Sequence, residues 1–192
     1  SKFKIVTSGG IVCAQVDSSG QSVTVEMGSV SFQSNIIPVT GESREVLNET
    51  LEISGVKLTF CSATIGNPHC VVLHRTISAE ETLRLGPLIE THPSFPNRTN
   101  VQFLEVLNRN TIRIEIWERG AGYTLASGSS SCAAASVALR LGLCDAEIAV
   151  LMPGGQIDIT ISENYNIIMK GSVTSIGKMT LDLECMDFEI PA

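Results

Sequence analysis

A run of small, uncharged residues most limits the folds open to this chain. Residues 132–139 read Cys-Ala-Ala-Ala-Ser-Val-Ala-Leu, at the centre of a helix that the pattern predicts over 129–143. The helix has no polar face there, and a helix without a polar face is stable only when other elements bury it. Small side chains also let neighbouring strands approach it closely. We therefore expect the rest of the chain to wrap around this segment.

Short segments with period-two alternation are predicted to be strands. They lie near residues 3–5, 12–16, 23–27, 51–65, 69–74, 101–107, 111–118, 147–152, 156–162, 166–175 and 179–185, with a hairpin turn at 8–10. A second helix is predicted over 78–89, where Ser78 and Glu81 fit a capping box. Many strands around one buried helix predict an α+β fold, a mixed β-barrel wrapped around a central helix.

Charge and composition argue against several classes of partner. The 192 residues include 13 Lys and Arg against 20 Asp and Glu, a net charge of −7, which argues against nucleic acid and an anionic membrane surface. No apolar run reaches membrane-spanning length and no signal-peptide pattern is present, so a cytoplasmic protein is expected. The six cysteines and three histidines show no metal-ligand spacing, so reduced thiols and no metal site are expected.

The junction between the strand ending at Glu118 and the central helix is the strongest candidate for a binding site. Gly128 and Ser129 fall in the first helical turn, directly after Ser127. The free backbone N–H groups and the positive dipole end of such a turn favour an anion. A substrate carboxylate would fit there, beside Glu118 and Arg119. A plain strand-to-helix turn relieved by glycine explains the same residues without a ligand.

Strand alternation places Glu118 on an apolar face. It shares parity with Ile112, Ile114 and Ile116, so its carboxylate is predicted to point inward. An inward carboxylate is unfavourable unless it is paired or hydrogen-bonded. It could bind a substrate ammonium or support a proton transfer, and a structural ion pair with Arg119 would explain it equally well.

A second polar cluster lies at Asn67 and His69, around Pro68. His69 opens an apolar strand, where a histidine serves either in catalysis or as a hydrogen-bonded core residue. Asn67 and Asn100 could contact a ligand or merely form turns. Only their combination with the segment around Glu118 favours a functional site.

Several motifs in a fixed order resemble the diaminopimelate epimerase family of cofactor-independent amino-acid epimerases. They are Gly66-Asn-Pro-His-Cys70, Leu85-Gly-Pro-Leu88, Phe95-Pro-Asn-Arg-Thr-Asn100, Glu118-Arg-Gly-Ala-Gly122 and Pro153-Gly-Gly155. The resemblance implies two similar domains, each a mixed barrel around a central helix, with the active site between them.

The resemblance covers only the later part of such a protein. It implies that residues 1–30 are closing strands of an otherwise missing first domain, 31–180 the second domain and 181–192 a return strand or tail. The family's first half carries a Cys-Gly-Asn-Gly segment, and no cysteine here has that context. The chain alone is therefore expected to be inactive and to need an N-terminal half or a companion chain, and a homodimer remains open.

The resemblance also implies roles for the candidate residues. Two thiols of the family face each other across the substrate α-carbon, and Ser127 stands where one of them is expected. The implied catalytic residues are Ser127, His69 and Glu118, and the implied substrate-binding residues are Asn67, Asn100, Arg119, Gly128 and Ser129. No cofactor and no metal are implied. A serine hydroxyl is a much poorer base than a thiol. Tyr123 stands in place of an acidic residue of the usual pattern, which could change the pocket wall.

The predicted function is that of an amino-acid epimerase or racemase, an isomerase of lysine biosynthesis acting on a diaminopimelate-like substrate. Two alternatives stay open. One is a one-base isomerase or lyase in which Ser127 only orients the substrate or a water. The other is a relative that binds an amino acid without turning it over.

Overall fold

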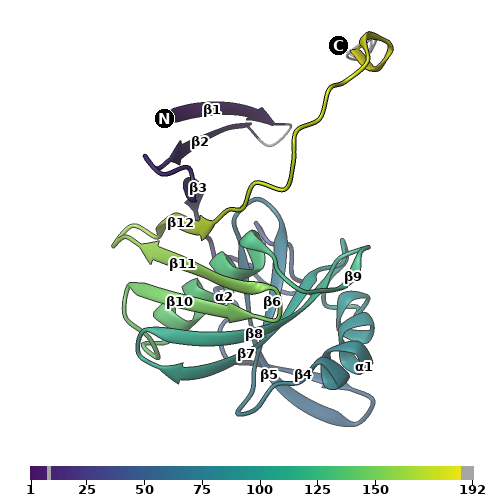
Figure 1. Cartoon of the computed structure of the whole chain (residues 1–192). Helices are drawn as coiled ribbons and strands as arrows, with labels where there is room; N and C mark the ends of the chain where they lie inside the picture. Colours follow the sequence, from purple (N-terminus) through teal and green to yellow (C-terminus); the bar gives the residue numbers. More distant parts are fainter. Residues whose placement is uncertain (8–9, 187–192) are drawn as a thin grey trace.

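The computed structural model describes residues 1–7 and 10–186, and the described strands form one mixed sheet (Figure 1). The strands are β1 (Lys2–Thr7), β2 (Gly10–Val16), β3 (Ser22–Ser29), β4 (Glu49–Ile53), β5 (Val56–Thr64), β6 (Pro68–Leu73), β7 (Asn100–Asn108), β8 (Thr111–Glu118), β9 (Gly122–Thr124), β10 (Glu147–Met152), β11 (Gly155–Ile161) and β12 (Asn166–Ser172). Their order in the sheet is β1-β2-β3-β12-β11-β10-β8-β7-β6-β5-β4, with β9 paired to β8.

Two α-helices make the crossovers of this sheet. The first, α1 (Ala79–Glu90), connects β6 to β7, and the second, α2 (Gly128–Arg140), lies between β9 and β10 in the chain. Strand β6 pairs in parallel with β7, and β8 pairs in parallel with β10. Parallel neighbours need a long connection, usually a helix. Both predicted helices are thus confirmed, with boundaries shifted by one to three residues.

The sheet curves around α2. The helix packs against seven strands, β5, β6, β7, β8, β10, β11 and β12, and residues 130–138 are all buried. The segment directly after β3 lies between the start of β12 and the end of β5. There the N–H of Val30 donates to Tyr165 O at 3.1 Å and the N–H of Ser31 to Thr64 O at 2.9 Å. The prediction of an α+β fold, a mixed sheet wrapped around a buried helix, is confirmed. The absence of a polar face decided this arrangement.

Helix α1 covers the outer face of β7 and β8 and also contacts β4 and β9. Its N-cap is Ser78, whose Oγ accepts a hydrogen bond from the N–H of Glu81 at 3.2 Å. Leu85 and Ile89 are fully buried in a second core that also contains Phe103. The two helices thus sandwich the strands that end at the candidate site.

Strands β1, β2 and β3 extend the sheet beyond β12 (Figure 1). The strand registers place Phe3 beside Ala14, Ala14 beside Val25, and Val25 beside Met169. This apolar row crosses the extension and reaches the edge of the helix-filled region. The predicted turn at 8–10 falls partly on residues 8 and 9, which lie outside the described residues.

After Ser172 the chain leaves the sheet and runs away from the body (Figure 1). The strand predicted near 179–185 is wrong, because residues 179–182 carry no strand and Leu183–Met186 form a short 3₁₀ helix, η1. Alternation alone does not form a strand without a hydrogen-bonded neighbour. Residues 187–192 of the predicted tail lie outside the described residues. In the described part of the chain, no helix is long and apolar enough to cross a membrane.

Candidate active site

Three strand ends meet at one end of the barrel. His69, at the start of β6, pairs with Asn100, at the start of β7. The Oδ1 of Asn100 accepts a hydrogen bond from the N–H of Arg119, just after β8, at 3.0 Å. The Nδ2 of Asn100 donates to Pro68 O at 2.9 Å. Asn100 is buried, so this amide ties the cluster around His69 to the segment that carries Glu118 and Arg119.

His69 is fully buried and lies 3.0 Å from Asn67, between Nε2 of the ring and Oδ1 of the amide. Because Oδ1 only accepts, Nε2 carries the proton in the neutral ring and Nδ1 is the basic atom. Burial lowers the pKa of His69 to about 4; Gln102 partly opposes this shift and the charge of Arg119 adds to it. The ring is therefore neutral at pH 7.

Gln102 connects His69 to the start of α2. Its Nε2 donates to Ser130 Oγ at 3.0 Å, while Gln102 Oε1 and His69 Nδ1 are buried and have no partner among the described residues. The amide is close enough to raise the pKa of His69. Exchanging its O and N atoms would give both a partner, with Nε2 donating to His69 Nδ1 and Oε1 accepting from Ser130 Oγ. We favour that orientation, since buried polar atoms are nearly always paired. In it the amide donates to the neutral ring and no longer raises the pKa of His69, so the ring stays neutral at pH 7.

Ser127 is the N-cap of α2 and has extended backbone angles, φ −153° and ψ 125°. Its Oγ accepts from the N–H of Ser130 at 3.5 Å, and its carbonyl oxygen accepts from Ser131 Oγ at 2.8 Å. The first turn contains no acidic residue, so the N–H groups of Gly128 and Ser129 leave the helix mouth suited to an anion. Met169 of β12 borders this mouth, since a Cβ on Gly128 would lie 2.8 Å from its Sδ.

Glu118 is half-buried, and its Oε2 accepts from Thr124 Oγ1 of β9 at 3.3 Å. The predicted inward face of β8 is confirmed, because Ile112, Ile114 and Ile116 are fully buried in the core around α2. The Nη1 of the exposed Arg119 donates instead to Asn97 O at 3.0 Å. An ion pair between Glu118 and Arg119, the structural explanation considered above, is not formed within residues 1–7 and 10–186.

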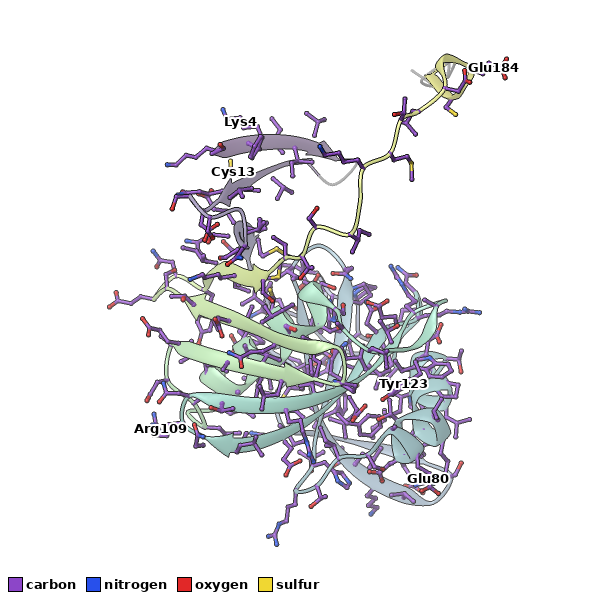
Figure 2. All side chains as sticks on the ribbon, viewed as in Figure 1. Lys4, Cys13, Glu80, Arg109, Tyr123 and Glu184 are labelled. Carbon is purple, nitrogen blue, oxygen red and sulfur yellow. The ribbon has the colours of Figure 1, made fainter. Side chains whose placement is uncertain are left out.

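Tyr123 does not face Glu118. It pairs with Trp117 across β8 and β9, whereas Glu118 pairs with Gly122, so the two side chains point to opposite faces. Tyr123, which is labelled in Figure 2, donates from Oη to Glu115 Oε2 at 2.5 Å. Burial and the bond to Glu115 raise the pKa of Tyr123 to about 12.

The structure thus joins Asn67, His69, Asn100 and Arg119 by hydrogen bonds and strand pairing, and Gln102 of β7 bonds Ser130 in the first turn of α2. Glu118, directly before Arg119, bonds Thr124 instead. Two supporting residues were missed by the sequence analysis, Gln102 and Glu90. Gln102 sits on an apolar strand, and the alternation that singled out Glu118 would have found it. Glu90 ends α1 and had no signal in the local pattern.

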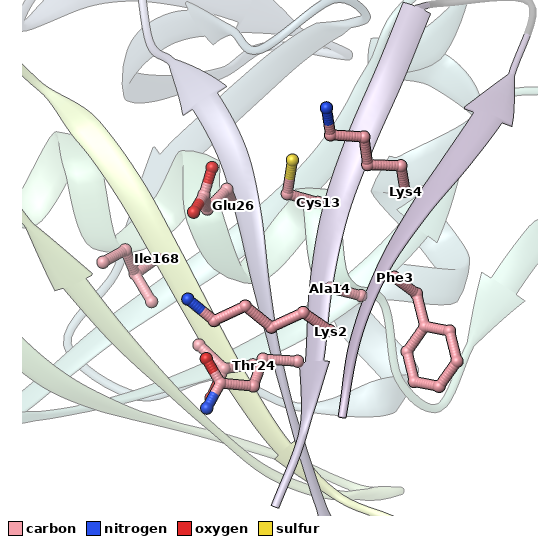
Figure 3. A pocket seen from close by; sticks show the side chains of 9 residues that line it. Lys2, Phe3, Lys4, Cys13, Ala14, Thr24, Glu26 and Ile168 are labelled. Atoms are coloured by element: carbon pink, nitrogen blue, oxygen red, sulfur yellow. The ribbon is translucent and has the colours of Figure 1, made fainter.

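A hollow of about 520 Å³ lies elsewhere, on β1, β2, β3 and Ile168 of β12 (Figure 3). Its lining includes Lys4, Cys13 and Glu26, and none of the predicted site residues. The side-chain chemistry, not the volume, therefore identifies the candidate site. Among the described residues, no group of three His, Cys, Asp or Glu side chains could hold a metal ion.

Comparison with known proteins identifies the family of this chain. Residues 61–176 match the family model described as Diaminopimelate epimerase. A protein of Nostoc sp. named Diaminopimelate epimerase 2 is 54% identical over 187 residues, which are 97% of this chain and 66% of that protein. The chain belongs to the diaminopimelate epimerase family. The Diaminopimelate epimerase of Alkaliphilus metalliredigens is 37% identical, over 92% of this chain and 63% of its own length.

The chain spans just under two thirds of the length of these two family members. Solved structures show the same fold at low identity. A probable proline racemase from Agrobacterium radiobacter aligns with TM-score 0.67 and 16% identity, over 97% of this chain and 62% of that one. A hydroxyproline epimerase from Agrobacterium vitis aligns with TM-score 0.65 and 17% identity, over 90% and 56%.

Proposed function

We propose that this chain is the later part of an amino-acid epimerase, an isomerase that removes and returns the α-proton of diaminopimelate without a cofactor. One observation carries the proposal: His69, Glu118 and the N-terminus of α2 meet at one end of the barrel, in a chain of the diaminopimelate epimerase family. The substrate is taken from the names of the relatives.

The two charged groups on the substrate α-carbon have separate partners in this proposal. The α-carboxylate accepts hydrogen bonds from the N–H groups of Gly128 and Ser129 at the mouth of α2. These donors and the helix dipole stabilise the negative charge that develops when the α-proton leaves. The half-buried carboxylate of Glu118 binds the α-ammonium. Neutral His69 is buried beside Asn67 at the same end of the barrel.

The distal end of the substrate is bound by Arg119 and Asn67. Arg119 is exposed, and its guanidinium can pair with a distal carboxylate. Asn100 uses its amide to hold Pro68 O and the N–H of Arg119, so it contributes to substrate binding mainly by fixing Arg119. Asn67 is half-buried and also bonds His69.

A further part of the protein completes the site. The apolar row that crosses β1–β3 ends at Met169, which borders Gly128 at the mouth of α2. Whatever covers that face therefore lies beside the cradle. Residues 1–30 then belong to the first domain, and 31–180 form the second. The relatives are half as long again as this chain, and the extra part, a companion chain or a second copy is the expected cover.

Ser127 favours a variant of this function. Its Oγ already accepts a backbone hydrogen bond as the helix N-cap, and a hydroxyl is a poor base without an activating partner. On this observation the second candidate is a one-base reaction on the same fold. There the thiol of the missing part abstracts the proton, and Ser127 orients the substrate or a water.

Deuterium exchange at the α-carbon of diaminopimelate tests the proposal. The 192-residue chain alone is expected to exchange no α-proton, because it supplies only one face of the α-carbon. Fused to the part of the Nostoc relative that precedes the match, it should exchange from one stereoisomer but invert poorly. Ser127→Cys in the fusion should restore inversion, because a helix N-terminus lowers the pKa of a thiol from about 8.5. Ser129→Cys, two residues further into the helix, is the matched control and should not.

Two results contradict parts of this proposal. Full two-way epimerisation by the Ser127 fusion would show that the hydroxyl suffices. A folded Ser127→Cys fusion that exchanges nothing would favour a relative that binds an amino acid without turning it over.

A further inference from the structure

Glu90, the last residue of α1, carries a buried carboxylate that has no role in the proposed function. The residue is 6% exposed. A buried carboxylate is strongly unfavourable unless several donors satisfy it. Its partners therefore show which part of the structure it stabilises.

Three donors meet this carboxylate. The indole Nε1–H of Trp117 donates to Oε2 at 2.7 Å, and the backbone N–H of Gly120 donates to Oε1 at 3.0 Å. The guanidinium of Arg98 reaches Oε1 from Nη1 at 3.3 Å. Hydrogen bonds to a charged acceptor are about twice as strong as neutral ones.

These donors bracket the residues proposed to bind substrate. Trp117 and Gly120 lie immediately before and after the pair Glu118 and Arg119. One side chain therefore holds both ends of this four-residue segment. Arg98 lies two residues before Asn100, whose side-chain amide accepts a hydrogen bond from the N–H of Arg119. Through Arg98, Glu90 therefore also contacts the segment that leads into β7.

Trp117 is itself held in place by α1. A Cβ on Gly86 would lie 2.6 Å from the Cγ of Trp117, so the ring packs directly on the helix backbone. The indole cannot follow a displaced carboxylate without losing this packing. The contacts of Glu90 with Trp117 and Gly120 therefore fix residues 117–120 to α1.

We propose that Glu90 is a positioning residue that sets where Glu118 and Arg119 lie relative to the mouth of α2, and so sets the affinity for the substrate ammonium and distal carboxylate. Its consequence for catalysis rests on the proposed function, whereas its hold on residues 117–120 does not. Glu90 itself does not touch the substrate.

Glu90→Gln tests the proposal with little change in volume. The amide has one acceptor oxygen for donors on two sides, so Trp117 or Gly120 must face an NH₂ group. The matched control is Glu80→Gln, the same change at an exposed position in the first turn of α1 (Figure 2).

Two readouts separate the structural claim from the functional one. Trp117 is the only tryptophan, so its indole N–H gives one signal in an ¹⁵N–¹H spectrum of the 192-residue chain. Glu90→Gln should move that signal and the amide signals of residues 118–120. In the Ser127→Cys fusion it should raise KM for diaminopimelate about tenfold and change kcat less than about threefold, the pattern of a misplaced binding group. Glu80→Gln should change neither.

Unchanged signals of residues 118–120 in folded Glu90→Gln would overturn the proposal, as would shifted signals with unchanged KM in an active fusion. If Glu90→Gln does not fold, Trp117→Phe removes one donor and keeps a ring against Gly86. It should then move the amides of residues 118–120 and raise KM in the same direction. An inactive fusion with Glu90 intact would instead refute the proposed function, and the amide signals would still decide the role of Glu90.

Discussion

The central strands around α2 and the β1–β3 extension of the sheet both alternate, but their burial is very different. On β8, Ile114 is fully buried against α2, whereas Ile5 on β1 is 48% exposed. Phe3 beside it is 51% exposed, and no described helix packs on β1, β2 or β3. The first region is a finished core, and the second is an apolar face without a cover among the described residues.

This difference teaches that alternation identifies a face but not what buries it. The small, uncharged residues of α2 allow seven strands to pack on one helix. The extension has equally apolar residues and no such partner within the described chain. Because its apolar row ends at Met169, beside the mouth of α2, the missing cover would also be a neighbour of the candidate site.

The largest contrast is expected from the same substitution in the two regions. Ile114→Ala should lower the free energy of unfolding by about 2–5 kcal/mol, because it leaves a cavity in a packed core. Ile5→Ala should lower it by less than about 1 kcal/mol in the 192-residue chain, since the side chain is half exposed. Urea denaturation measures both. Equal losses would mean that the extension is as well packed as the barrel.

The pH dependence of stability should come partly from His69 in the helix-filled region. Burial lowers its pKa from 6.5 to about 4, so the unfolded chain binds this proton more readily between those values. The contribution of the neutral His69 ring to the free energy of unfolding is complete above about pH 6.5 and is lost as pH falls to about 4. The loss amounts to about 3 kcal/mol. His69→Gln should reduce the stability difference between pH 7 and pH 4 by that amount. An unchanged difference would contradict the burial of a neutral ring.

A pair of glycines gives a smaller contrast. Gly86→Ala places a Cβ 2.6 Å from Trp117 and should lower the free energy of unfolding by about 1–3 kcal/mol. Gly171→Ala, on the β12 strand that carries the extension, meets nothing within 4 Å. It should therefore change stability by less than about 0.5 kcal/mol. Thermal unfolding, with the fluorescence emission of Trp117 as a local probe, tests the pair. An unchanged free energy of unfolding in Gly86→Ala would show that α1 can move away from Trp117 at little cost.

Thiol labelling should separate the regions without changing stability. Cys13 in the extension is half-buried and Cys185 in the tail is exposed, whereas Cys61, Cys70, Cys132 and Cys144 are buried. Burial also raises the pKa of Cys132 to about 12, and thiolates are the reactive form. Two thiols should react quickly with a colorimetric reagent at pH 8, and six after unfolding in guanidinium chloride. Rapid reaction of four or more in the native protein would contradict the packed core.

Much of the fold was predictable because its signals are local. The alternation of β8 placed Ile112, Ile114 and Ile116 on one buried face, and Ser78 began α1 at a genuine N-cap. The tail was mispredicted for the opposite reason. Residues 179–182 alternate like a strand but have no described neighbour to pair with, and pairing is not a property of the segment itself.

The candidate site was predictable only in part. Ser127, Gly128 and Ser129 were placed at the mouth of α2 from their sequence positions, and the structure agrees. The contact between Asn100 and Arg119 depends on the antiparallel register of β7 and β8, and the pairing of His69 with Asn100 depends on the parallel register of β6 and β7. No local pattern specifies those registers. The assignment of catalytic and binding roles stays a prediction.

The sequence by itself determined that α2 is buried, that strands surround it and that Glu118 points inward, because each follows from the periodicity of one segment. Only the tertiary structure decided that Glu90 holds Trp117 and Gly120, that Gln102 lies between His69 and Ser130, and that Tyr123 faces away from the site. Glu90 and Trp117 are 27 positions apart, and Gln102 and Ser130 are 28 apart. Such contacts depend on how the crossover connections and strand registers bring distant segments together. The pattern of residues within one segment does not specify either of them.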